Sequence, residues 1–278
     1  MKYLFLLLLP IIYIAGWIIW YFRFGRPAGD SLKIISFHKI SNTPELGGTF
    51  CYIKQFESFV KYLNERGFKS VSINEMISKK PVNGIVIFFD DAYESVYKTA
   101  YPILERYGMK ASIAPITNYI GKENMWDGGL NRFKHMSDEQ IKEMSDKGYD
   151  IVSHSASHKD MRKLKKEELI YECVESKRKL EEITNKRVDY FMYPYGLFNN
   201  RVKNAVKSAG YTSAFSSYAL RNDAFDNFAI GRHSMYIIDT VFDLSIIINR
   251  APLILFGHED AKGRIINWFA RFSGVIKV

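Results

Sequence analysis

Gly84-Ile-Val-Ile-Phe-Phe-Asp-Asp91 is an apolar run of strand-forming residues that ends in two adjacent carboxylates. A short apolar run rich in β-branched and aromatic side chains is typical of a strand that is buried on both faces, as in a parallel sheet. For an isolated Asp-Asp pair, the ordinary interpretation is the N-cap of a following helix, where carboxylates are favoured. The pair therefore becomes informative only if other polar residues also stand at strand ends.

Strand-like and helix-like segments alternate on both sides of this run. Strands are expected at 33–38, 69–73, 84–90, 110–116, 150–154, 190–193 and 212–215. Helices are expected at 55–66, 92–107, 138–147, 166–184 and 200–209. This alternation predicts an α/β fold with a parallel sheet and crossover helices. The number of units in the chain favours a closed barrel over an open doubly wound sheet.

Two further polar motifs follow expected strands. His154-Ser-Ala-Ser-His158 has two histidines about one helical turn apart, and Tyr193-Pro-Tyr-Gly196 closes a later strand. Barrel enzymes place their chemistry at the carboxyl ends of their strands, so these motifs and the Asp-Asp pair are expected to meet. A lone pair of histidines is more often surface decoration than a metal site. In combination, the motifs predict a divalent metal site with a spare carboxylate, which suits amide or ester hydrolysis.

The three motifs resemble the first three motifs of the polysaccharide deacetylases, the NodB-homology enzymes of carbohydrate esterase family 4. The resemblance spans about residues 33–236 and implies a distorted (β/α)7 barrel. It also implies that a divalent metal ion is bound by Asp91, His154 and His158. Zinc is the metal expected, with cobalt or nickel as alternatives. Two imidazoles and one carboxylate leave coordination positions open, as a hydrolytic metal site requires.

The same resemblance implies the other catalytic roles. Asp90 is expected to be the general base, and the peptide N–H of Tyr195, after Pro194, is expected to help hold the oxyanion. For the acid, the usual Leu-x-His context is poorly matched by Leu255-Phe-Gly-His258. His38, which ends an expected first strand, resembles the acid of permuted family members that deacetylate poly-N-acetylglucosamine. The alternative for His38 is a packed histidine without a catalytic role.

The chain departs from the family pattern at two places. Met192 stands where the third motif often has an arginine that orients the base. Arg232 is a candidate substitute from another strand end, and an ordinary surface salt bridge is the alternative for it. Trp126-Asp127 has the residue types of the fourth motif in reversed order, so Asp127 either borders the sugar site or belongs to a packed loop. No catalytic part is expected for His135 or His233.

The amino-terminal residues predict a membrane anchor. Residues 3–22 carry no charge, and a helix of this length rises about 30 Å, which matches the hydrocarbon core of a bilayer. A cleavable signal peptide is the competing interpretation, but the apolar stretch is longer than usual and no small-x-small site follows it. The expected organisation is an uncleaved single-pass anchor (1–23), a linker (24–32) and a barrel domain with a C-terminal helix (33–278), with the domain extracytoplasmic.

Composition adds broad limits. The chain is 47% hydrophobic and 25% charged, as in ordinary globular proteins, and its net charge is +9. The basic charge is explained by a solvated surface, or by interaction with an anionic membrane face or an acidic cell-wall polymer. No nucleic-acid partner is expected, the oligomeric state is left open, and Cys173 is expected to be a buried free thiol. The predicted function is removal of N-acetyl groups from a polysaccharide that contains N-acetylglucosamine. The alternatives are an O-acetyl esterase and an inactive carbohydrate-binding barrel.

Overall fold

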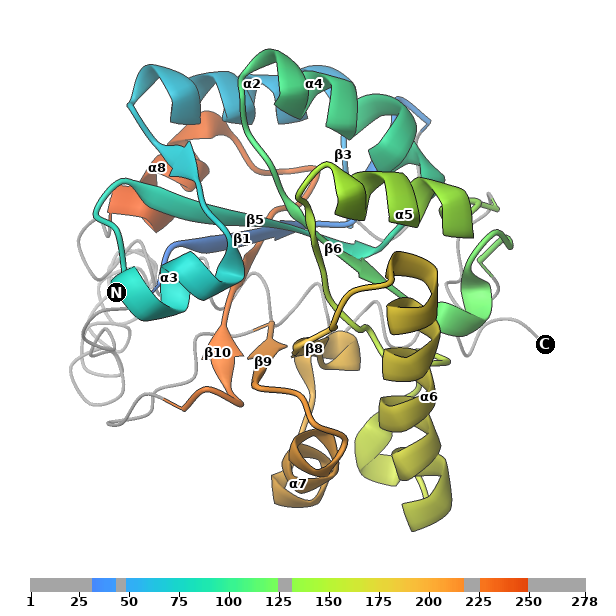
Figure 1. Cartoon of the computed structure of the whole chain (residues 1–278). Coiled ribbons are helices and arrows are strands. Elements are labelled where there is room, and N and C mark those ends of the chain that lie inside the picture. The colour runs from blue at the N-terminus through green and yellow to red at the C-terminus, as the bar shows by residue number, and fades with distance from the viewer. Residues whose placement is uncertain (1–31, 44–48, 125–131, 218–225, 250–278) are drawn as a thin grey trace, which may run out of the picture.

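The structure is a computed structural model that describes residues 32–43, 49–124, 132–217 and 226–249 (Figure 1). The strands are β1 (Ile34–Phe37), β2 (Lys39–Ile40), β3 (Phe50–Cys51), β4 (Lys69–Ser70), β5 (Gly84–Asp91), β6 (Ser112–Pro115), β7 (Asp150–Ile151), β8 (Tyr190–Met192), β9 (Ser213–Ser216), β10 (Ile230–Gly231) and β11 (His233–Ser234). The helices are α2 (Ile53–Glu65), α3 (Ile73–Lys79), α4 (Tyr101–Arg106), α5 (Asp138–Asp146), α6 (Lys166–Thr184), α7 (Asn200–Ser208) and α8 (Val241–Asn249). A π-helical turn, η1 (Val96–Ala100), leads into α4, and short 3₁₀ turns are η2 (Thr117–Tyr119), η3 (Met161–Lys163) and η4 (Pro194–Gly196).

The strands named above pair in parallel and form three sheets. The largest has the order β11-β1-β5-β6-β7 with β4 beside β5, the second has the order β10-β9-β8, and β2 pairs with β3. An isolated parallel bridge between Ser153 and Phe191 connects the first two sheets. Helices α2, α4 and α5 lie along one side of β1, β5 and β6, and α6 and α7 lie near β8 and β9 (Figure 1). The predicted α/β fold with parallel strands is therefore confirmed.

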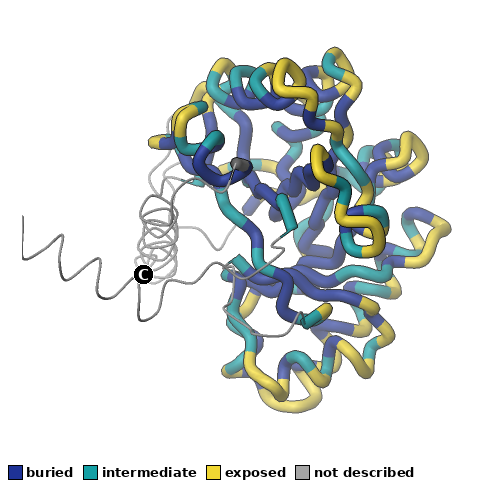
Figure 2. Tube along the Cα trace, turned by 90° about the vertical axis from the view of Figure 1, so that its left-hand side faces the viewer, coloured by how far each residue is buried: buried dark blue, intermediate teal, exposed yellow. Residues whose placement is uncertain are grey.

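Both faces of the central strands are buried, and successive residues contribute to different cores. Ile87 and Phe89 of β5 belong to the core that the helices cover, whereas Val86 and Phe88 belong to a second core. The ring of Phe88 lies 4.9 Å from the ring of Phe215 in β9, although β5 and β9 belong to different sheets. The two sheets therefore share an interior, and the exposed positions lie mainly on helices and turns around it (Figure 2).

Element ends were predicted well where capping residues mark them. The bounds of α6 are the predicted ones, and the capping box of α5 forms, with the Ser137 hydroxyl accepting from the N–H of Gln140. The strand predicted at 69–73 is partly wrong, because β4 ends at Ser70 and Ile73 begins α3. Ser72 accepts a hydrogen bond from the N–H of Glu75, and this N-cap outweighs the strand preference of the neighbouring apolar residues.

The predicted anchor and the C-terminal helix lie in residues 1–31 and 250–278, outside the described residues. In the part of the chain that the structure describes, no helix combines the length and the hydropathy needed to cross a bilayer. Cys173 is buried and forms no disulfide, as predicted, and the same is true of Cys51.

Candidate metal centre and active site

The three sequence motifs meet at the carboxyl ends of β5, β7 and β8. Asp90 and Asp91 end β5, His154 lies three residues after β7, and the turn η4 begins two residues after β8. Each motif therefore stands at or just after the carboxyl end of a strand. Barrel enzymes with parallel strands place their catalytic residues at these ends.

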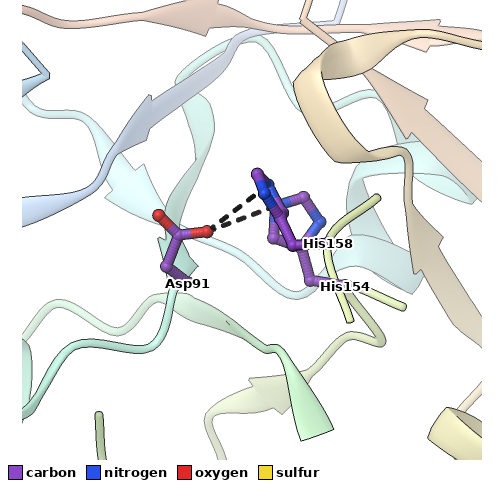
Figure 3. Close-up of side chains that lie close together, drawn as sticks. All are labelled: Asp91, His154 and His158. Atoms are coloured by element: carbon purple, nitrogen blue, oxygen red, sulfur yellow. Dashed lines mark ion pairs between the residues drawn. The ribbon is translucent and has the colours of Figure 1, made fainter. Parts of the chain in front are cut away.

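Asp91, His154 and His158 form a buried cluster with the donor set of a metal site. One ligand atom from each lies within 4.8 Å of the others. The Oδ1 atom of Asp91 lies 3.5 Å from Nε2 of His154 and 3.7 Å from Nε2 of His158 (Figure 3). Ligand atoms about 2.1 Å from one tetrahedral ion are roughly 3.4 Å apart, so the side chains fit a bound metal ion.

Hydrogen bonds orient the ligands. Nδ1 of His154 donates to the carbonyl oxygen of Met192 at 3.0 Å, which turns Nε2 towards Asp91. The carbonyl oxygen of Asp91 accepts from Nδ1 of His135 at 2.7 Å. Burial lowers the pKa of both His154 and His158, and the effect is stronger at His158, where other histidines add to it. Both rings are therefore neutral at pH 7, which is the form that binds metals.

The backbone around the ligands adopts unusual conformations. Asp91, Ala92, Ser155, His158 and Tyr195 all have φ between 52° and 66°, although none is glycine. Non-glycine residues in this region cost about 1–3 kcal/mol each and persist only where the surroundings hold them. The helix predicted at 92–107 begins later, with η1, because the chain turns here instead of continuing as a helix. These turns direct the side chains into the common site.

Asp90 is held by a buried arginine and is not part of the cluster of Asp91, His154 and His158. The Arg232 guanidinium donates to both carboxylate oxygens of Asp90, at 2.8 and 3.1 Å, and also to the carbonyl oxygen of Ser216. The Arg232 side chain is 1% exposed, and its guanidinium lies over the ring of Phe88. The alternative interpretation of Arg232, as part of an ordinary surface salt bridge, is therefore wrong. Burial alone would raise the pKa of Asp90, but Arg232, with His38 and His154, lowers it below its ordinary value. Asp90 is therefore ionised at neutral pH.

His38 and Tyr195 border the same cluster. Nε2 of His38 lies 3.7 Å from Oδ2 of Asp90. Burial, aided by Arg232 and neighbouring cations, lowers the pKa of His38 to about 4 despite the opposing effect of Asp90. The ring of Tyr195 lies 4.6 Å from that of His158.

Comparison with known proteins identifies the domain. A family model described as Polysaccharide deacetylase matches residues 78–214. YxkH of Bacillus subtilis, assigned to the same group, is 31% identical over 192 residues, which cover 67% of this chain and 63% of that protein. The chain carries a polysaccharide deacetylase domain. The poly-β-1,6-N-acetyl-D-glucosamine N-deacetylase of Staphylococcus aureus is 30% identical over 176 residues, which cover 58% of this chain and 59% of that protein.

This chain thus spans only about three fifths of the length of those curated relatives, 63% and 59%. A solved structure gives the same fold for the deacetylase domain. IcaB from Ammonifex degensii superposes with a TM-score of 0.67 at 22% identity, covering 79% of this chain and 97% of that one.

The deacetylase domain brings most of the predicted site residues together. Trp126-Asp127 and His258 lie outside the described residues. His135, for which no catalytic part was expected, contacts the site through its Nδ1, which donates to the carbonyl oxygen of Asp91. No sequence motif marks this supporting contact. His233 lies in β11 and pairs with β1.

Arg232→Met is expected to destabilise the deacetylase domain strongly. The substitution leaves the Asp90 carboxylate buried without its cation, and breaking one side of a buried ion pair typically costs about 3–5 kcal/mol. Urea unfolding of the purified protein measures the loss. Arg187→Met is the matched control, because Arg187 is 75% exposed in its pair with Asp189, and little change is expected there. Equal stability of the two variants would contradict the assignment of Arg232 as the support of Asp90.

Proposed function

We propose that this protein is a metal-dependent hydrolase that removes N-acetyl groups from a polysaccharide containing N-acetylglucosamine. The observation that carries the proposal is the convergence of Asp91, His154 and His158 beside a separate ionised carboxylate, Asp90. The match to the polysaccharide deacetylase family supports the reaction class. The substrate class is supported by the similarity to an N-deacetylase of poly-β-1,6-N-acetyl-D-glucosamine.

Zinc is the metal that we propose for the site, with cobalt or nickel as substitutes. One carboxylate oxygen and two imidazole nitrogens suit these ions, and the spacing of Asp91, His154 and His158 fits a tetrahedral centre. When bound, such an ion lowers the pKa of a coordinated water and polarises the acetyl carbonyl group.

The protein side chains divide the remaining chemistry. Asp90 takes the proton of the attacking water, because it is ionised and Arg232 holds it in one orientation. The peptide N–H of Tyr195, which follows Pro194 in η4, donates to the oxyanion of the tetrahedral intermediate. One such preorganised donor is typically worth about 10²–10³ in rate.

His38 protonates the leaving amine. Its lowered pKa of about 4 makes the ring neutral at pH 7 before the reaction begins. Negative charge that develops on the substrate near His38 during the reaction opposes this shift, because a nearby anion favours the protonated imidazole. His38 can then receive the proton that Asp90 removed, since the two side chains are 3.7 Å apart, and pass it to the nitrogen.

The strand order supports the further proposal of a distorted (β/α)7 barrel. Strands β10 and β11 are separated only by Arg232, and they pair with β9 and β1 respectively. Counted as one interrupted strand, they complete a circuit of seven through β1, β5, β6, β7, β8 and β9, with the Ser153–Phe191 bridge between β7 and β8. The second core, to which these strands contribute, would be the barrel interior.

For the organisation of the chain, we propose the membrane anchor (1–23), linker (24–32) and catalytic domain (33–278) that the sequence predicts. The support is the uncharged stretch at residues 3–22. An extracytoplasmic domain would meet cell-surface or exported polysaccharide, the substrate class proposed above.

Removal of the metal is expected to abolish amine release from N-acetylglucosamine oligomers. A strong chelator should reduce turnover to background, and zinc, cobalt or nickel should restore it, because the residual side chains cannot activate water alone. Amine release is followed by a fluorogenic amine reagent, with the heat-denatured protein as the blank.

Two other outcomes separate the alternatives. An O-acetyl esterase would release acetate from an O-acetylated glycan but no amine from the oligomers. An inactive carbohydrate-binding barrel would bind the oligomers and release neither product. Full activity after exhaustive chelation would overturn the proposed mechanism.

A further inference from the structure

Glu172 of α6 is a buried carboxylate whose hydrogen bonds reach the turn between the two metal-binding histidines. It is 3% exposed. Its Oε2 atom accepts the backbone N–H groups of Ala156 and Ser157, each at 2.8 Å, and its Oε1 atom accepts the hydroxyl group of Ser157. Burying a carboxylate is unfavourable unless donors replace its water, and here one short turn supplies three of them.

The next turn of α6 holds the segment just before that turn. Ser176 lies four residues after Glu172. Its hydroxyl oxygen accepts a hydrogen bond from the hydroxyl group of Ser153, with 2.7 Å between the two Oγ atoms. Ser153 is the residue that precedes His154. Because residues four apart lie on the same face of a helix, one face of α6 contacts the ligand-bearing segment at both of these points.

The turn itself needs such support. Ser155 and His158 have φ of 65° and 58°, which are unfavourable values for residues with a side chain. One internal hydrogen bond, from the N–H of His158 to the Ser155 hydroxyl at 3.0 Å, stabilises the turn. The carbonyl oxygens of Ser155 and Ala156 accept the backbone N–H groups of Thr117 and Asn118 in η2. Glu172 adds three hydrogen bonds from the other partner of the turn, helix α6. Glu172 therefore supplies three of the hydrogen bonds that hold the residues just before His158, whose Nε2 lies 3.7 Å from Oδ1 of Asp91.

We propose that Glu172 is a positioning residue of the metal centre, which sets metal affinity by fixing the turn that carries His158. The inference rests on the proposed metal-dependent function. Glu172 is not a metal ligand in this assignment, because its oxygens already accept hydrogen bonds from the turn. Groups that orient metal ligands typically contribute about 10–100-fold in metal affinity or activity.

Glu172→Ala is expected to weaken zinc binding by about 10–100-fold. Affinity is measured on the full-length protein by competition with a chromogenic chelator, and the unfolding temperature of the metal-free protein is measured beside it. Glu172→Gln should bind zinc nearly as tightly as the wild type, because an amide oxygen can still accept both backbone N–H groups. Glu172→Asp keeps the negative charge, but its side chain is one methylene shorter and its carboxylate no longer reaches the turn. This variant should bind zinc more weakly than the wild type, and it tests the proposal if the Ala variant fails to fold.

Glu181→Ala is the matched control on the same helix. Glu181 accepts the backbone N–H of Val188 at 3.0 Å, towards the far end of α6, so its loss should lower stability and leave zinc affinity unchanged. Wild-type zinc affinity in the Ala and Asp variants of Glu172 would overturn the proposal. So would an equal loss of affinity in Glu181→Ala, since the effect would then follow from general destabilisation. Absence of zinc binding by the wild type would instead overturn the proposed function.

Discussion

Asp90→Asn is expected to lower kcat for amine release by about 10²–10⁴, the usual contribution of a general base. The amide has nearly the shape of the carboxylate but cannot accept the proton of the attacking water. Metal binding should persist, because Asp90 is held by Arg232 while the ligand cluster consists of Asp91, His154 and His158. The measurement is kcat at saturating zinc, together with the zinc content of the purified variant.

His158→Ala is the comparison that separates the two roles. This substitution removes a ligand, so zinc content and turnover should both fall. If Asp90→Asn kept full turnover, or if it lost zinc as completely as His158→Ala, the assignment of Asp90 as a base outside the metal centre would be wrong.

The parts of the fold that local signals mark were predictable from the sequence. The apolar run of β5 and the capped helices α5 and α6 lie where they were expected. Strands β10 and β11 were missed, because Ile230-Gly-Arg-His-Ser234 is short and is interrupted by glycine and a charged residue. This segment is a strand because it pairs with β9 and with β1, and β1 is distant from it in sequence.

The candidate site divides in the same way. The metal-binding side chains stand in compact motifs at strand ends, and so the sequence could indicate them. The residues that support the site are harder to identify, because they are distant in sequence. Arg232, for which the sequence left two interpretations open, is 142 residues from Asp90, and His135 is 44 residues from Asp91. Glu172 is one of several glutamates in α6, and no pattern distinguishes it from the exposed ones. Only the packing of α6 against the turn reveals its contacts.

His38→Ala is expected to reduce turnover of N-acetyl substrates by about 10²–10⁴, the range for loss of a general acid. An amine leaves poorly unless it is protonated, whereas the nitrophenolate of 4-nitrophenyl acetate leaves without a proton. The loss should therefore be much smaller for the activated ester. The measurement is kcat/KM for both substrates, at the same zinc concentration, for the wild type and the variant.

The comparison of substrates also distinguishes an acid from a group that only supports Asp90. His38 lies 3.7 Å from Asp90, so its removal could disturb the base, and a disturbed base would slow water attack on both substrates alike. Equal losses for amide and ester would therefore reject the acid role and leave His38 as a neighbour of the base. A loss confined to the amide requires a proton donor at the leaving nitrogen, because water attack and oxyanion binding are common to both reactions.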